Sequence, residues 1–108
     1  ANSGLEFHLT DNPLLLCYSK ATSDLSNVLV MVVNLDPFHK QSGWVTLDLD
    51  LLGISSDQSY QAHDLITDSR FVWHGPVNFV ELDPESCPVH ILRLRKRVHT
   101  EEDFDYYL

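Results

Sequence analysis

The sequence is poor in cysteine, glycine and proline, and each shortage excludes a class of protein. Its 108 residues contain two cysteines, fewer than the disulfide scaffold of a small secreted domain usually needs. Four glycines and five prolines are too few for a collagen-like or low-complexity chain. Cys17 and Cys87 stand in apolar or proline-flanked settings, so we expect buried free thiols and no catalytic cysteine.

Basic residues are also scarce. Seven Lys and Arg face sixteen Asp and Glu, and the net charge of −9 argues against nucleic acid or an anionic membrane as a partner. The one basic run, residues 93–97, is followed by an acidic cluster at 101–105, so we interpret it as a solvated strand end. No signal-peptide pattern or membrane-spanning apolar run is present.

What the chain does have is a series of short, β-rich apolar runs bounded by turn residues. Hydrophobic residues make up 44% of the chain, which predicts one packed domain over residues 1–108. We expect strands at residues 5–9, 14–20, 28–35, 43–51, 60–66, 70–73, 77–82 and 89–97, followed by a tail at 98–108. The runs at 70–73 and 77–82 look like a hairpin joined through His74-Gly75-Pro76. With no helical periodicity, this predicts an all-β, two-sheet antiparallel sandwich of about eight strands with Greek-key connections.

Some of these runs have more apolar faces than a sandwich can bury. Residues 28–33 and 14–17 are apolar at every position, although a sandwich strand buries one face only. In the run 43–51, the alternation places Trp44 opposite the row of Val45, Leu47, Leu49 and Leu51. Because an uncovered apolar patch usually marks an interaction surface, we predict a module that docks on a larger body. The alternative is that long loops cover the outer face.

The polar residues form no recognisable catalytic or metal-binding motif. The six histidines stand singly, without the paired spacings of a zinc site, and His90 shares a face with Leu92 and Leu94 as a half-buried histidine would. His63 and Asp64 are strand neighbours that point to opposite faces, so they cannot pair with each other. We therefore predict no catalytic, cofactor-binding or metal-ligating residue.

Aromatic side chains leave two interpretations open. The aromatic faces of Phe38, Trp44, Trp73, Phe71 and Phe79 could stack on sugar rings. The commoner role of such residues is to fill a core or a domain interface.

Five segments, in order, carry a resemblance to a known family: "TDNPLLLCYSK" (10–20), "VVNLDPFHKQSGWVTLDL" (32–49), "YQAHDLITDSRFVWHGPVNFVELDP" (60–84), "PVHILRLR" (88–95) and "EEDFDYYL" (101–108). Through them the chain resembles the C-terminal β-sandwich domains of the α-amylase clan, glycoside hydrolase family 13. Within that clan it is most similar to the maltosyltransferases that extend α-1,4-glucan from maltose 1-phosphate.

The resemblance implies a role for the domain and a context for it. Catalysis in the clan belongs to a TIM-type barrel that precedes this domain, so none of its catalytic residues transfers here. A cytoplasmic, non-catalytic module that packs on and stabilises this barrel is expected, with no cofactor. A carbohydrate-binding module for α-glucan is the alternative, and a second copy of the parent enzyme is a further candidate partner. The candidate interface or sugar-contact residues are Phe38, Trp44, Trp73, Phe104 and Tyr106.

Overall fold

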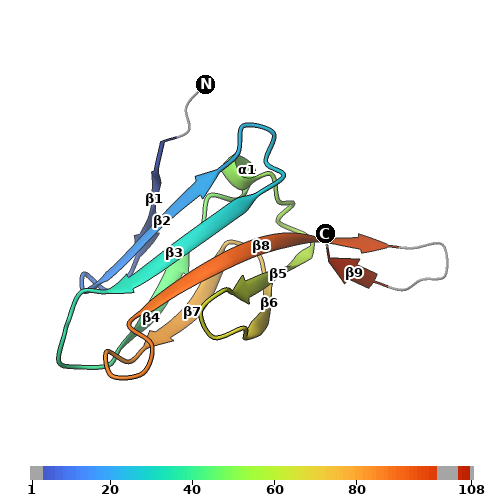
Figure 1. The fold of residues 1–108 in the computed structure, drawn as a ribbon. Helices are drawn as coiled ribbons and strands as arrows, with labels where there is room; N and C mark the ends of the chain where they lie inside the picture. The colour runs from blue at the N-terminus through green and yellow to red at the C-terminus, as the bar shows by residue number, and fades with distance from the viewer. Residues whose placement is uncertain (1–3, 100–104, 108) are drawn as a thin grey trace.

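The computed structural model describes residues 4–99 and 105–107, which form nine strands and one short helix (Figure 1). In the described part of the chain, no helix has the length and apolar character needed to cross a membrane. The elements are β1 (Glu6–Thr10), β2 (Leu15–Ala21), β3 (Val28–Asn34), β4 (Gln41–Thr46), α1 (Leu49–Leu52), β5 (Ser59–Asp64), β6 (Arg70–His74), β7 (Val77–Leu82), β8 (Val89–His99) and β9 (Asp105–Tyr107).

Eight of the strands form one continuous antiparallel sheet rather than two. Their order is β6-β5-β8-β3-β2-β1-β4-β7, and β9 adds to the far end of β8. β1 joins the two halves, because its residues 6–8 pair with β2 and its residues 9–10 pair with β4. The sheet thereby curls into a nearly closed barrel. The all-β class and the strand number are confirmed, but the two-sheet sandwich is not clearly present, since β1 belongs to both halves.

The predicted Greek key is present in the first four strands. β1, β2 and β3 follow one another as antiparallel neighbours, and β4 returns to lie beside β1. Asn34, at the end of β3, holds the returning loop, because its side-chain amide donates to the carbonyls of His39 and Leu82, both at 3.0 Å. The loop therefore starts from a fixed, buried anchor.

The hairpin expected around Gly75 does not form between the described residues. β6 pairs with β5, whereas β7 pairs with β4, so the two strands are the opposite edges of the curled sheet. The turn between them bridges the edges through side-chain and backbone bonds. The Tyr60 hydroxyl donates to the Gly75 carbonyl at 2.8 Å, and the Leu47 amide donates to the Pro76 carbonyl at 2.8 Å. These hydrogen bonds hold the turn close to both edges of the sheet, although β6 and β7 do not pair with each other.

The strand expected over 43–51 ends at Thr46, and a helical turn, α1, follows it. Asp48 caps the turn by accepting a hydrogen bond from the Leu51 amide at 3.3 Å, and Gly53 ends it with a φ of 72°. Leu49 and Leu52 are buried whereas Leu51 is exposed, which is helical spacing rather than the predicted alternation. The Leu-Asp alternation suits a strand equally well, so capping by Asp48 and Gly53 decides the outcome.

The barrel core is built from alternate positions of the strands. In β3, Val28, Val30 and Val32 are buried, and the residues between them face outward but remain half-buried. The outward Met31 lies beside Tyr18 of β2 and Ile91 of β8 in the strand register. The outer face of β3 is therefore partly covered by long side chains of its own sheet, and needs an external partner less than its sequence indicates.

Candidate functional site

Several large apolar side chains are exposed on the outside of β1, β4 and β7. Leu9, Thr46 and Val77 are opposite one another across the three strands, and Trp44 faces Phe79 two residues further along. We define the outer apolar face by the large side chains of this surface, whose exposed fractions are 48–75%: Phe7, Leu9, Trp44, Val77 and Phe79. These strands form one side of the barrel, away from β3 and β8 (Figure 1). The predicted outward orientation of Trp44 is confirmed.

Trp44 is held firmly in this face. Its ring meets that of Phe79 edge-on, with centroids 5.4 Å apart and an interplanar angle of 66°. Its backbone amide donates to the Asp11 carboxylate at 2.8 Å, and its carbonyl accepts from the Asp11 amide at 3.1 Å. The aromatic pair is therefore an ordered feature of the surface, presented by two paired strands.

The other candidate residues from the sequence do not join this face. Phe38 is 82% exposed in the loop between β3 and β4, where the Asp36 carboxylate accepts from its amide at 2.9 Å. Trp73 lies in the core at 9% exposure and meets Tyr60 edge-on, with ring centroids 6.3 Å apart. Trp73 therefore has little surface to offer a partner or a sugar.

The two tail candidates are not placed by the structure. Phe104 lies outside the described residues. The backbone of Tyr106 lies in β9, where it pairs with Val98 of β8.

The basic run of β8 borders an open pocket instead of bare solvent. Arg93, Arg95 and Lys96 line a pocket of about 540 Å³ together with Leu52, Ile54 and the turn before β3. The Arg93 Nε atom is buried and has no hydrogen-bond partner in the described part of the chain. The interpretation of this run as a solvated strand end therefore holds for Lys96, which is exposed, and less well for the half-buried Arg93 and Arg95.

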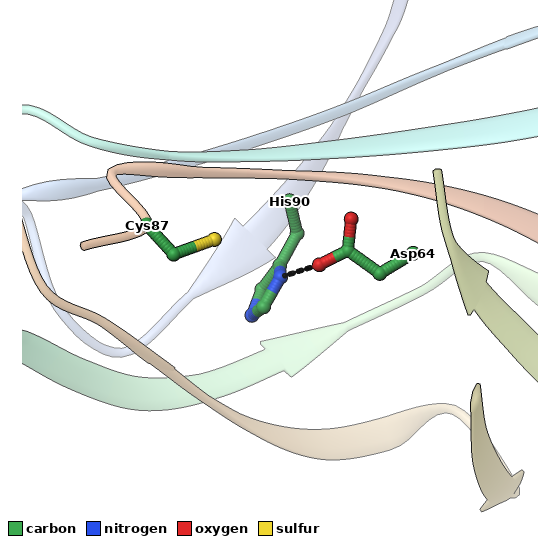
Figure 2. A group of neighbouring side chains, drawn as sticks. All are labelled: Asp64, Cys87 and His90. Atoms are coloured by element: carbon green, nitrogen blue, oxygen red, sulfur yellow. Dashed lines mark hydrogen bonds and ion pairs between the residues drawn. The ribbon is translucent and has the colours of Figure 1, made fainter. Parts of the chain in front are cut away.

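A second feature is a polar cluster at the Val89 end of β8, where Asp64, Cys87 and His90 converge (Figure 2). Asp64 ends β5, His90 is the second residue of the neighbouring strand β8, and Cys87 belongs to the loop before β8. One donor atom from each residue lies within 4.8 Å of the others. His90 Nδ1 is 2.8 Å from an Asp64 oxygen, and the Cys87 thiol donates to the Val89 carbonyl at 3.2 Å.

The cluster combines a buried carboxylate with an imidazole and a thiol. The Asp64 side chain is fully buried, and burial alone would raise its pKa. Hydrogen bonds from the Ile66 amide, His90 and Thr67 more than offset this and lower the pKa of Asp64 below its ordinary value. Burial raises the pKa of the Cys87 thiol, and the neighbouring Asp64 charge raises it further. The thiol is therefore protonated at neutral pH.

The sequence predicts the setting of single residues in this cluster, but not that the three residues lie together. His90 is half-buried and paired, as predicted, and Asp64 does not pair with its neighbour His63, which bonds Asp68 at 2.6 Å instead. The convergence was missed because Asp64 is remote in the sequence. The Cys87-Pro-Val-His90 spacing was the available signal, since two ligands three residues apart are common in metal sites.

Comparison with known proteins matches most of the chain to one family. Residues 7–94 match the family model described as "GLGE, C-terminal". The chain is 37% identical over 103 residues to the alpha-1,4-glucan:maltose-1-phosphate maltosyltransferase of Myxococcus xanthus, covering 95% of the chain and 15% of that protein. The enzyme of the same name from Methylacidiphilum infernorum is 38% identical over 90 residues, covering 83% of the chain and 13% of that protein.

The relatives are far longer than the chain. A third, from Salinibacter ruber, is 36% identical over 103 residues, again 15% of its length. The chain thus spans about 15% of the curated maltosyltransferases that it matches. These findings confirm the resemblance drawn from the sequence, and because the match extends over most of its residues, the chain belongs to the GLGE C-terminal domain family.

Proposed function

We propose that this chain is the non-catalytic C-terminal domain of a cytoplasmic, glucan-elongating maltosyltransferase, and that it packs on and stabilises the catalytic barrel of that enzyme. The outer apolar face carries the proposal. It presents five large apolar side chains on three paired strands, in a domain whose relatives have most of their length elsewhere. Such a contiguous patch is typical of a surface that is covered in the complete protein.

The free energy available from burying these side chains supports docking through the outer apolar face. Fully burying a large apolar side chain stabilises a protein by roughly 1.5–3 kcal/mol, so side chains that are about half exposed can each add about 1 kcal/mol on docking. Five of them give several kcal/mol before the cost of ordering the interface. Within one polypeptide this cost is reduced, because the two parts are already tethered.

The proposal is tested in the parent polypeptide by changing the outer apolar face, with circular dichroism of the 108-residue variant as the check that the domain itself still folds. We expect Trp44→Ser combined with Phe79→Ser to lower the thermal midpoint of the parent enzyme's catalytic barrel and its maltosyl-transfer activity. Ile66→Ser combined with Val72→Ser is the matched control, because both residues are exposed, at 52% and 67%, away from this face: Ile66 in the turn after β5 and Val72 on β6. An unaltered barrel in a parent that lacks the whole domain would refute the stabilising role. A loss of stability seen only with the control pair would show that the docking surface is not the outer apolar face.

The alternative function is α-glucan binding, and the ordered Trp44–Phe79 pair favours it as a platform for a sugar ring. Maltooligosaccharide titration of the 108-residue chain, followed by tryptophan fluorescence, separates the two functions. Trp44 is half-exposed and Trp73 is buried, so a bound sugar would alter chiefly the Trp44 emission. A saturable change that disappears in Trp44→Phe would establish sugar binding, and a flat titration at millimolar sugar would exclude it.

A further inference from the structure

The buried charge of Asp64 is the starting point for a second site. Its side chain has no solvent exposure, and its partners are the Ile66 amide, the Thr67 side chain and His90. Within residues 4–99 and 105–107, no Lys or Arg forms an ion pair with it. A buried carboxylate normally requires a full positive charge nearby, and a histidine supplies one only when it is protonated.

A divalent cation would balance the charges of the cluster. The Asp64 carboxylate and a Cys87 thiolate carry two negative charges, and a neutral His90 adds none. Binding of a divalent ion by these three groups therefore leaves the site neutral. The metal–sulfur bond replaces the S–H bond of Cys87, which releases one proton. A metal bound at His90 Nδ1 replaces the proton that this nitrogen donates to Asp64, and that proton is carried on Nε2 instead.

The donor atoms select the class of metal. Sulfur, imidazole nitrogen and a single carboxylate oxygen suit zinc and its close substitutes such as cobalt, whereas calcium and magnesium prefer all-oxygen sites. Three protein ligands with a fourth position open to water is an ordinary zinc arrangement. Cys87 is half-buried, so an ion can approach from its side.

The geometry is close to that of a bound site. Zinc–ligand bonds of about 2.0–2.3 Å place tetrahedral donors roughly 3.3–3.6 Å apart, and the three donors already lie within 4.8 Å. Asp64 and His90 lie on paired strands, whereas Cys87 lies in a loop (Figure 2). The Cys87 thiol donates one hydrogen bond, to the Val89 carbonyl. Two small adjustments complete the site: the widest separation between donors shortens by about 1 Å, and the 2.8 Å contact between Asp64 and His90 lengthens by about 0.5 Å.

We propose that Asp64, Cys87 and His90 bind one zinc-type divalent ion, which ties the end of β5 to the start of β8 and the loop before it. This site lies apart from the outer apolar face and is independent of the proposed docking role. The ion has a structural effect, because it links elements that are distant in the sequence.

The test uses the 108-residue chain, reduced and stripped of metal, with Co²⁺ and Zn²⁺ as the probes. We expect one Co²⁺ per chain, with a near-ultraviolet thiolate-to-cobalt absorption band and displacement by Zn²⁺. Zn²⁺ should also raise the thermal midpoint. Cys87→Ser and His90→Gln should each weaken Co²⁺ binding at least tenfold.

Two controls keep the result specific. Cys17→Ala removes the other thiol, which is 1% exposed in the core, and should leave the cobalt band intact. His63→Gln removes a histidine that bonds Asp68 on the outside and should bind Co²⁺ like the wild type. The proposal is overturned if Co²⁺ shows no thiolate band, or if Cys87→Ser binds Co²⁺ as tightly as the wild type.

Discussion

Trp44 of β4 and Phe79 of β7 face each other across the strand ladder, with ring centroids 5.4 Å apart, yet each remains about half exposed. Directly opposed side chains of an antiparallel pair are the unit of sheet stabilisation. Here the unit lies on the outer surface near the edge of the curled sheet. The pair can therefore stabilise β7 and still present its rings to a partner.

This contact has a measurable coupling energy. An edge-on aromatic pair contributes about 0.5–1.5 kcal/mol beyond its burial, so Trp44→Ala and Phe79→Ala should be non-additive by about this amount. The free energies of unfolding of the wild type, both single variants and the double variant form the cycle, measured with urea. Strict additivity would show that the rings do not interact in solution.

One buried hydroxyl, that of Tyr60, holds the turn between the edge strands β6 and β7. The Tyr60 hydroxyl donates to the Gly75 carbonyl at 2.8 Å and accepts from the Asn78 side chain at 3.0 Å. Tyr60→Phe leaves this buried carbonyl with only its 3.2 Å bond from Asn78. We expect a loss of about 1–2 kcal/mol in the free energy of unfolding, visible in urea denaturation.

Tyr18 provides the matched control for this change. It is half-buried on the outer side of β2, and its hydroxyl forms no hydrogen bond with the described residues. Tyr18→Phe should alter the free energy of unfolding by only a few tenths of a kcal/mol. Equal losses in the two variants would contradict a special role for the Tyr60 hydroxyl.

How far the sequence predicts this fold can be judged from β3 and its neighbours. A continuous run of β-branched and other apolar residues correctly predicts a strand from Val28, because such a run is a local signature of a strand. The Greek key follows from the order of strands and loops. Closure does not follow, because it depends on β1 pairing with β2 at one end and with β4 at the other. The five residues of β1 carry no sequence pattern which shows that its first half pairs with one strand and its second half with another.

The two features of the candidate site differ in the same way. The orientation of Trp44 is predictable because it depends on its neighbours along one strand. The Asp64–His90 contact spans 26 residues and depends on β5 pairing with β8, which local periodicity does not specify. The missed helix α1 is an intermediate case. Its caps, Asp48 and Gly53, are visible in the sequence but compete with an equally good alternation.

Two glycines with the same backbone conformation allow the cost of backbone strain to be distinguished from the cost of side-chain crowding. Gly53 and Gly75 both have a φ of 72°, where an L-residue costs about 1–2 kcal/mol. A Cβ at Gly53 would lie 2.7 Å from Leu25 Cδ1, whereas one at Gly75 would meet no atom within 4 Å. We expect Gly75→Ala to lose about 1 kcal/mol of unfolding free energy and Gly53→Ala roughly 1 kcal/mol more. Thermal denaturation compares them, and a larger loss at Gly75 would show that crowding by Leu25 is not the cause.

The buried histidine of β1 predicts acid sensitivity. His8 Nδ1 accepts a hydrogen bond from the Asp48 amide at 3.2 Å, which leaves Nε2–H to donate to the Ser19 hydroxyl at 2.7 Å. Protonating Nδ1 would break the bond to Asp48. Burial lowers the pKa of His8 below its ordinary value of 6.5, although the charges of Asp48 and Glu6 partly oppose this shift.

The direction of the effect on stability follows from linkage. Because the pKa of His8 is lower in the folded chain, the unfolded chain binds more protons as the pH falls through 6.5. The His8 contribution is complete above this pH and is lost progressively below it, down to the folded pKa. His8→Asn keeps an acceptor for the Asp48 amide and removes the titrating ring. The free energy of unfolding should therefore fall less steeply between about pH 7 and pH 5 in this variant than in the wild type. Chemical denaturation at each pH measures both slopes, and identical slopes would show that His8 is not held neutral by the fold.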